Sequence, residues 1–281
     1  RYGQTLKSVE NYKKADEILA QFYLKNTKDN RAKIGNSQKN YLTEIEKNSG
    51  RYTFENAGIN SKYSDFGTSF YNDELVFASS RNSEKIFSRK HSWTNQYFTN
   101  LYTADLGEEM SPGTVNKFSK KINSKFNEST PVFTKDGKTM YFTRNNYLDG
   151  KKGKDGNKVT LVKIYKASFE NDNWDKLTEL PFNSDQYSVA HPTLSADEKT
   201  MYFASDMPGT RGQSDLFKVQ LNEDGSFGTP QNLGADINTE GRETFPMFTN
   251  ENELYFASDG HPGLGGLDVF VTKIDKDGSI G

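Results

Sequence analysis

The chain has 281 residues and a formal net charge of −2, and its 20 Phe, 15 Tyr and 2 Trp residues are enough to build a substantial apolar core. This charge gives no basic field for nucleic acid, and the lack of cysteine excludes disulfides, thiolate metal sites and a cysteine nucleophile. There is no run of about 18 apolar residues, so no transmembrane segment is expected.

Residues 1–48 have a helical pattern that differs from the rest of the chain. Apolar residues recur there at intervals of three and four, which predicts one stripe facing a partner surface: Leu6, Val9, Tyr12, Ala15, Leu19 and Phe22. The spacing of Gly3, Tyr12, Ala15 and Leu19 resembles the later part of a tetratricopeptide repeat, and a plain amphipathic helical hairpin is the alternative. Because one such repeat is too short to be stable, either further repeats precede it or the helices dock on the β region.

From residue 51 onward the sequence predicts strands organised in four copies of one repeat. Each copy begins with an Ile/Phe-Asn-Ser/Thr triplet, and the copies are about 60 residues apart. The triplets start at Ile59, Ile122, Phe182 and Ile237. Nine or ten residues later, the first strand is marked by Thr68, Pro131, Pro192 and Pro246. Two further alternating apolar runs complete three strands, and a fourth precedes the next triplet, which is the strand content of a propeller blade.

The register of the repeat makes a prediction about the ends of the β region. Tyr52–Phe54 precedes the first triplet, so it is expected to be the outermost strand of a blade. The last copy stops in the hairpin DKDGSIG, before its own outer strand. Either further blades follow in a longer parent protein, or Tyr52–Phe54 closes a small propeller.

The repeats resemble a known family. The pattern E/S-x-x-P-x-F, DGK-x-MYF-x-S and G-x-GG-x-D-V-F is similar to the PD40, WD40-like repeats related to those of TolB, and Ser258–Phe270 is the most specific piece. With the tetratricopeptide-type (TPR-like) helices, the chain resembles outer-membrane lipoproteins of Bacteroidetes that carry an OmpA-like domain. The resemblance implies a mainly β fold, with a TPR-like segment at 1–48 and a PD40 β-propeller at 51–281.

The resemblance also implies a function. It implies a non-enzymatic periplasmic scaffold at the outer membrane, in type IX secretion or gliding motility, beside a PorP/SprF-like β-barrel or an assembly complex. Peptidoglycan would be held by the OmpA-like domain. Neither that domain nor a lipobox cysteine is in these residues, so peptidoglycan binding is not assigned to them. A glycan-binding or glycan-cleaving propeller of sialidase or lyase type is the alternative.

Two Gly-rich loops each connect a pair of aspartates: Asp206 to Asp215, and Asp259 to Asp268. Paired carboxylates can bind a cation or transfer protons. The same residues can instead cap a loop by accepting hydrogen bonds from backbone N–H groups. Because two repeats carry the pair at one spacing, a structural role is favoured.

No sequence motif points to catalysis or to a bound cofactor. The three histidines lack metal-ligand spacing, and no Gly-x-Ser-x-Gly elbow, phosphate loop or complete calcium loop is present. We therefore expect no metal, no cofactor and no enzymatic activity.

Partner contacts are expected where the repeats differ, because loops on a rigid scaffold usually carry recognition. The first repeat extends the loop Ile86–Phe98, whose aromatic and basic side chains are typical of an interface or of a locally packed loop. Its candidate residues are Ile86, Phe87, Arg89, Trp93, Tyr97 and Phe98. The second repeat inserts Asn145–Lys158, interpreted as a mobile solvated loop. Its candidates are Tyr147, Lys151 and Lys152.

Overall fold

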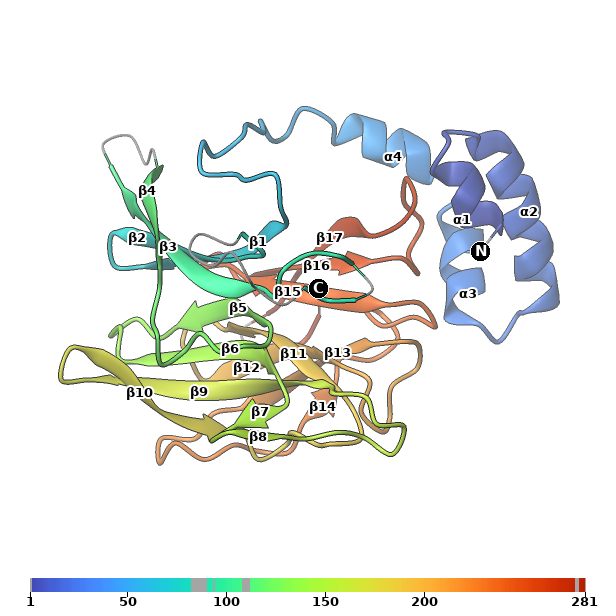
Figure 1. Ribbon diagram of the computed structural model, residues 1–281. Helices are drawn as coiled ribbons and strands as arrows, with labels where there is room; N and C mark the ends of the chain where they lie inside the picture. The colour runs from blue at the N-terminus through green and yellow to red at the C-terminus, as the bar shows by residue number, and fades with distance from the viewer. Residues whose placement is uncertain (1, 82–89, 93, 108–111, 276–277, 281) are drawn as a thin grey trace. The chain divides into compact units, whose positions relative to one another are not determined.

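The structure, a computed structural model, describes residues 2–81, 90–92, 94–107, 112–275 and 278–280 (Figure 1). The chain forms two compact units, Arg1–Phe54 together with Ser195–Gly281, and Glu55–Leu194. In the described residues, all helices end before residue 48 and all strands begin after residue 64. The predicted division into 1–48 and 51–281 follows this change of secondary structure, and as a statement about domains it stays a prediction.

The unit Glu55–Leu194 contains two four-stranded antiparallel sheets. The first has the order β1 (Asp65–Tyr71), β2 (Glu74–Ser79), β3 (Asn100–Leu106) and β4 (Pro112–Lys117). The second has the order β5 (Glu128–Phe133), β6 (Thr139–Asn145), β9 (Val162–Glu170) and β10 (Asn173–Glu179). A hairpin of β7 (Tyr147–Leu148) and β8 (Lys151–Lys152) is inserted between β6 and β9. β11 (Val189–Leu194) lies against β5, β6 and β9.

The other unit contains the helices, the part of the third repeat that follows β11, and the fourth repeat. The helices are α1 (Tyr2–Lys7), α2 (Tyr12–Lys25), α3 (Asn30–Ser37) and α4 (Tyr41–Lys47). β12 (Thr200–Ser205), β13 (Asp215–Gln220) and β14 (Gln231–Asn232) pair in chain order. β15 (Glu243–Phe248), β16 (Glu253–Ser258) and β17 (Asp268–Lys273) form a three-stranded sheet. None of the described helices is both long and apolar enough to cross a membrane.

The predicted fold class is confirmed: the chain is mainly β, with propeller-type sheets in repeat order and short helices at its start. The middle strands provide the core. Leu101, Phe142 and Trp174 belong to one buried cluster, and Leu216 and Phe256 belong to another in the second unit. β6 has five consecutive buried residues because both faces of a middle strand are covered. Each such apolar side chain contributes about 1.5–3 kcal/mol to folding.

The prolines predicted in the first strands follow a β-bulge or a residue with positive φ. The register shifts next to Thr68, Pro131 and Pro246. The residues immediately before the four marker positions have positive φ: Gly67 (64°), Thr130 (44°), His191 (57°) and Phe245 (49°). A bulge leaves a residue outside the ladder, so a proline there costs no strand hydrogen bond. Only the first repeat has glycine at the strained position, and a Cβ on Gly67 would lie 2.8 Å from the Thr130 side chain.

One expectation about the β region is wrong. Tyr52–Phe54 forms no strand, and Phe54 is 88% exposed. The first strand instead begins at Asp65. Tyr52 hydrogen-bonds through its hydroxyl to the Tyr255 hydroxyl of β16 at 2.9 Å. A three-residue segment makes few ladder hydrogen bonds, which is a weak gain against the cost of ordering it.

The expected apolar stripe from Leu6 to Phe22 is not one helix face. The helix stops after Lys7, Glu10 has a φ of 60°, and the Asn11 side chain caps a new helix by accepting from Lys14 N. Val9 falls in this turn and is 68% exposed. The local preference of asparagine for a helix start therefore overrides the apolar spacing.

Candidate functional site

The asparagine of the repeat triplet bonds to the backbone of the preceding repeat. Asn123 Oδ1 accepts from Leu101 N at 2.7 Å, and Asn123 Nδ2 donates to Leu101 O at 2.8 Å. The same two-bond contact joins Asn183 to Ile164 and Asn238 to Leu216. A side-chain amide presents a donor and an acceptor side by side, as a neighbouring strand would. The triplet is thus a connection between repeats.

An acid four residues after the triplet's Ser or Thr stabilises the same corner in three repeats: Asp65, Glu128 and Glu243. Glu243 accepts from Thr239 N at 2.8 Å, from Thr239 Oγ1 at 2.7 Å and from Ser258 Oγ at 2.6 Å. Burial raises the pKa of Glu243, and these donors oppose the rise by stabilising the carboxylate. In the sequence Glu128 and Glu243 are the first residue of the E/S-x-x-P-x-F pattern, whereas Asp65 lies outside it.

Three of the four predicted loop aspartates accept hydrogen bonds from backbone N–H groups. The donors are Arg211 N (2.9 Å) and Gly212 N (3.3 Å) for Asp215, Arg242 N (2.7 Å) for Asp259, and Gly265 N (3.1 Å) for Asp268. This is the geometry of loop caps. Asp206 follows β12 and is exposed. Within the described residues, no group of three His, Asp or Glu side chains is placed to hold a metal ion.

The carbonyl oxygen of the triplet's first residue accepts from a different side chain in each repeat. The donors are Arg81 Nη2 to Ile59 (2.7 Å), Arg144 Nη2 to Ile122, Tyr187 Oη to Phe182 (3.1 Å) and His261 Nε2 to Ile237 (2.7 Å). This contact fixes His261 in the tautomer with a proton on Nε2. Burial lowers the pKa of His261, and the bond to Ile237 opposes the shift. The histidine therefore has a structural partner.

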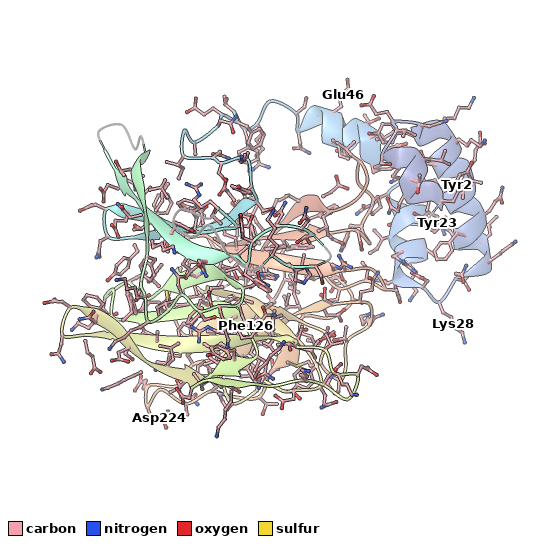
Figure 2. The ribbon with its side chains drawn as sticks, in the orientation of Figure 1. Tyr2, Tyr23, Lys28, Glu46, Phe126 and Asp224 are labelled. Carbon is pink, nitrogen blue, oxygen red and sulfur yellow. The ribbon has the colours of Figure 1, made fainter. Side chains whose placement is uncertain are left out.

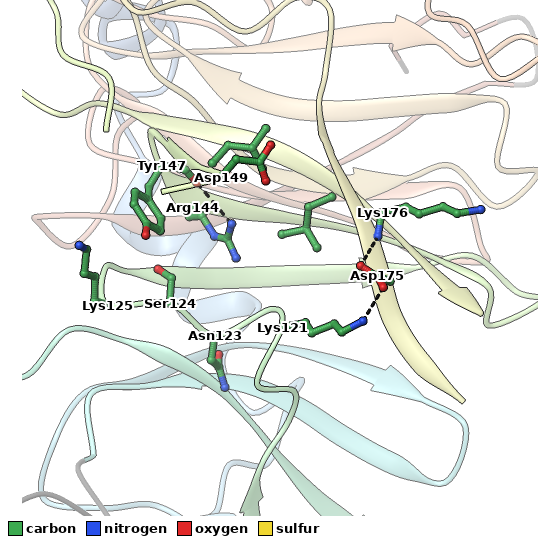
Figure 3. A pocket seen from close by; sticks show the side chains of 11 residues that line it. Lys121, Asn123, Ser124, Lys125, Arg144, Tyr147, Asp149, Asp175 and Lys176 are labelled. Carbon is green, nitrogen blue, oxygen red and sulfur yellow. Dashed lines mark hydrogen bonds and ion pairs between the residues drawn. The ribbon is translucent and has the colours of Figure 1, made fainter. Parts of the chain in front are cut away.

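The second repeat departs from the others at its inserted hairpin, and an open cavity of about 840 Å³ lies beside this hairpin (Figure 3). We call it the sheet-two cavity. It is lined by Lys121, Asn123, Ser124, Lys125, Arg144, Tyr147, Leu148, Asp149, Asp175, Lys176 and Leu177. Figure 3 shows Lys125 and Tyr147 on one side, Lys121 and Asp175 on the other, and Arg144 between them.

Arg144 positions the walls of this cavity. Its Nη2 donates to Ile122 O beside the triplet loop, and its Nη1 donates to Tyr147 O at 3.3 Å in the hairpin. Its Nε donates to Glu128 Oε1 at 3.1 Å. The other repeats carry serine at the end of the second strand, at Ser79, Ser205 and Ser258. An arginine at this strand position is thus specific to the second repeat, although Arg81 of the first repeat makes similar contacts with Ile59 O and Asp65.

Cations pack on aromatic rings at the edge of the cavity, where Lys125 and Tyr147 line it and Phe126 and Lys152 lie beside them. Phe126 and Tyr147 have ring centroids 4.8 Å apart. Lys125 Nζ lies 5.3 Å from the centre of the Tyr147 ring, and Lys152 Nζ lies 5.1 Å from the centre of the Phe126 ring. Each such contact at an exposed site contributes about 0.5–1 kcal/mol. The rings therefore hold two ammonium groups near the cavity without neutralising them.

The start of the inserted hairpin is held to the sheet by partly buried polar contacts. Tyr147 N donates to Tyr165 Oη at 3.2 Å, and Asn146 Nδ2 donates to Asp185 Oδ1 at 2.6 Å. Lys163 pairs with the same Asp185 at 2.7 Å. The interpretation of Asn145–Lys158 as a mobile solvated loop is therefore corrected. Its Lys, Gly and Asp composition concealed a hairpin whose partners lie elsewhere in the sequence.

The predicted partner-binding residues fall into three groups. Ile86, Phe87, Arg89 and Trp93 lie outside the described residues. Tyr97 and Phe98 are half-buried: Tyr97 contacts Tyr63 edge-to-face at 5.9 Å, and Phe98 contacts Phe126 edge-to-face at 6.2 Å. Tyr147 lines the sheet-two cavity, while Lys151 and Lys152 are exposed on the hairpin. The structure thus brings Phe98, Tyr147 and Lys152 together around Phe126.

The N-terminal helices dock on the last repeat within their own unit. Lys7 is 3% exposed, donates through Nζ to Gly263 O at 2.8 Å, and lies 4.3 Å from the centre of the Tyr41 ring. Asn30 Nδ2 donates to Ala235 O at 2.6 Å. Burial lowers the pKa of Lys7, opposed by the charges of Asp16 and Asp268. Of the two possibilities that the sequence left open, docking is the one observed, and a tetratricopeptide ancestry stays a prediction.

A smaller cavity of about 320 Å³ lies among these helices. Tyr23, labelled in Figure 2, packs so closely on Gly35 that a Cβ there would lie 2.4 Å from the ring. Asp16 accepts a hydrogen bond from Tyr41 Oη at 3.0 Å. Some of the polar groups that line this smaller cavity are therefore already hydrogen-bonded within the helices.

The sequence matches no protein-family model and no curated protein. TolB from Acinetobacter baumannii is 14% identical over 79% of this chain and 44% of its own, with a TM-score of 0.44. A puromycin-hydrolyzing peptidase from Mycobacterium tuberculosis is 15% identical over 78% of this chain and 29% of its own, with a TM-score of 0.43. An α-L-arabinofuranosidase from Lactobacillus brevis is 12% identical over 74% of this chain and 70% of its own, with a TM-score of 0.46.

The chain thus spans less than half the length of the TolB protein and of the peptidase. At these identities and TM-scores, the likeness carries no argument about function.

Proposed function

We propose that this protein is a non-enzymatic binding module that docks a protein partner at the sheet-two cavity. One observation carries the proposal: polar residues shared by the repeats are used in backbone contacts, whereas residues specific to one repeat gather at this cavity. Asn123 and Glu128 represent the first kind. Arg144, Tyr147 and Lys152 represent the second. A scaffold of similar blades acquires a specific surface where one blade departs from the rest.

The charge state of the cavity's carboxylates supports binding over catalysis. Asp175 accepts from the Lys121 ammonium, and this contact holds the pKa of Asp175 below its usual range. An acid of this kind stays ionised at neutral pH, so it has no proton to give to a leaving group. A glycosidase would also need a carboxylic acid with a raised pKa that reaches the substrate, and Glu128, whose pKa burial raises to about 7, is fully buried against Arg144. The glycan-cleaving alternative therefore has no support at this site.

The setting we propose is the periplasm at the outer membrane, in a parent protein held to peptidoglycan by an OmpA-like domain. The machinery would be that of type IX secretion or gliding, with a PorP/SprF-like barrel or assembly complex as partner. This part rests on the sequence resemblance of Ser258–Phe270 and of the helices. The docked helices would offer a second surface, so that two contacts share one scaffold.

The test is recovery of the partner from outer membranes with the tagged full-length protein, followed by mass spectrometry. A variant in which Tyr147 and Leu148 are both changed to Ser removes the hairpin's apolar contacts. A matched control changes Glu223 and Asp224 to Ser in an exposed turn of the other unit. We expect one dominant outer-membrane protein with the wild type and the control, reduced about tenfold or more with the cavity variant. Recovery of no such protein, or equal recovery with both variants, would overturn the proposal.

A further inference from the structure

We infer that the sheet-two cavity takes an acidic, extended peptide segment of its partner. In this arrangement, carboxylates of the segment pair with Lys125 and Lys152, and an apolar side chain packs on Leu148 and Leu177. The inference rests on the proposed function and adds the chemical class of the ligand. It follows from the balance of charge, from the shape of the site and from the strand at its edge.

The charges around the cavity do not cancel. Three of its cations already have carboxylate partners: Lys121 with Asp175, Arg144 with Glu128, and Lys176 with Glu170. In the described part of the chain, no carboxylate lies within 4.0 Å of the ammonium groups of Lys125, Lys151 and Lys152. Asp149 is the one acidic residue on the same hairpin. The hairpin and Lys125 therefore carry an excess of positive charge beside the cavity.

Two of these ammonium groups are already in place for a ligand. Lys125 lies over both Phe126 and Tyr147, at 5.7 and 5.3 Å from the ring centres, and Lys152 lies over Phe126. A lysine on an open surface loses side-chain entropy when it pairs with a ligand, and the rings reduce that loss by restricting the side chain beforehand. An anionic ligand would thus meet cations held on an aromatic wall.

The cavity favours a peptide over a glycan or a membrane surface. Leu148 and Leu177 line it together with Lys125, which provides a seat for an apolar side chain, and Lys152 lies on the adjoining hairpin. β10 is the last strand of its sheet in the described residues, and it has a bulge between Asp175 and Thr178 at the cavity. The backbone of an edge strand can pair with an extended peptide. A flat bilayer surface would not enter a recess of about 840 Å³.

The experiment measures binding of two fluorescein-labelled peptides by anisotropy, (Glu-Leu)4-Gly and (Lys-Leu)4-Gly, with the full-length protein. The test variant is Lys125→Glu with Lys152→Glu. Its control is Lys13→Glu with Lys28→Glu, which changes the net charge equally at two exposed lysines of the other unit. Thermal unfolding of each variant is measured alongside to verify that it is folded.

We expect the acidic peptide to bind the wild type, and its Kd to rise about tenfold or more in the test variant and less than about twofold in the control. Binding should weaken when salt rises from about 50 to about 200 mM, because the paired charges are near the surface. Equal binding of both peptides, or an equal loss in the control, would overturn the inference. So would binding to phosphatidylglycerol vesicles, through the same lysines, with no peptide binding. One result separates the inference from the proposed function. If the acidic peptide does not bind, but the variant with Tyr147→Ser and Leu148→Ser recovers less of the outer-membrane partner than the wild type, the inference is wrong and the proposed function stands.

Discussion

Arg144 and Glu128 form a buried ion pair in the second sheet, with 3.1 Å between Nε and Oε1 and with 4% and 0% of the two side chains exposed. Burial raises the pKa of Glu128 to about 7, while the Arg144 charge opposes the rise. The remaining nitrogens of Arg144 donate to Ile122 O and Tyr147 O. One side chain therefore connects the acid corner of a blade with the walls of the sheet-two cavity.

Arg144→Ser should destabilise the protein by about 3–5 kcal/mol at pH 8, because it leaves Glu128 buried without its cation. At pH 5 the loss should be smaller, because Glu128 can then be protonated. Urea unfolding of wild type and variant at both pH values measures the difference. Lys176→Ser, at a 64% exposed lysine in the same cavity, is the control and should change stability by less than about 1 kcal/mol. A loss for Arg144→Ser that is the same at both pH values would contradict this account of the pair.

Asn238→Ala should cost about 2–4 kcal/mol. Asn238 is fully buried, and its loss leaves Leu216 N and O without the partners that they have at 2.8 and 2.9 Å. Asn116→Ala, at an exposed position of β4, is the matched control and should change stability by less than about 0.5 kcal/mol. The midpoint of urea unfolding compares the two. Equal midpoints would show that the triplet asparagine does not connect the repeats energetically.

Asn30→Ala should loosen the helices from the last repeat. The side chain donates to Ala235 O at 2.6 Å and to Asn238 O at 3.3 Å, and each lost bond at a buried site costs about 1–3 kcal/mol. Short helices are marginal without packing, so backbone amide exchange over α2 and α3 should become about tenfold faster or more. Lys47→Ala breaks only an exposed ion pair with Glu44 and should leave this exchange unchanged. Unchanged exchange in Asn30→Ala would contradict the docking.

His191 and Glu128 should give opposite pH dependences. Burial lowers the pKa of His191 to about 4 from 6.5, so its contribution to stability is lost as the pH falls from about 6.5 toward 4. Glu128 has a folded pKa of about 7 against 4.5, so its contribution is lost as the pH rises through that range. The free energy of unfolding therefore changes with pH by up to about 1.4 kcal/mol per pH unit for each group. These two slopes have opposite signs between about pH 4.5 and 6.5.

His191→Gln removes only the first of these slopes. The difference in unfolding free energy between variant and wild type should therefore shift in favour of the variant as the pH falls from about 6.5 to 4.5. The His191 backbone N–H, which donates to Thr143 Oγ1 at 2.8 Å, is retained in the variant. Urea unfolding at several pH values measures the difference. A difference that does not vary with pH would show that His191 titrates alike in the folded and unfolded states.

Much of the fold could be predicted from the sequence because each strand carries its own local pattern. The runs at Met140 and Met201 alternate or stay apolar over a few residues and end at turn formers, so their order in the chain is readable. The prolines mark the first strands for a local reason, since they need a position without a ladder hydrogen bond. Where the local signal was ambiguous, as at Glu10 and Asn11, a helix cap replaced the expected continuous helix.

The site was less predictable because its contacts are between residues far apart in the sequence. The composition of the insertion points to Tyr147 and Lys152, but the ring that both contact is Phe126, which no motif marks. In the sequence, Arg144 differs only in standing where the matching second-strand runs of the other repeats have serine. The corner acids, such as Glu128, were hidden because their partners belong to the triplet and to the next strand.

The most direct test of the central claim is site-specific photocrosslinking in cells that produce the full-length protein. Benzoylphenylalanine placed at Tyr147 probes the sheet-two cavity, and the same residue placed at Asp224, an exposed turn labelled in Figure 2, is the control. The account predicts one discrete protein adduct from position 147 that is lost with Lys125→Glu and Lys152→Glu, and no such adduct from position 224. No adduct at 147, or the same adduct from both positions, would contradict it.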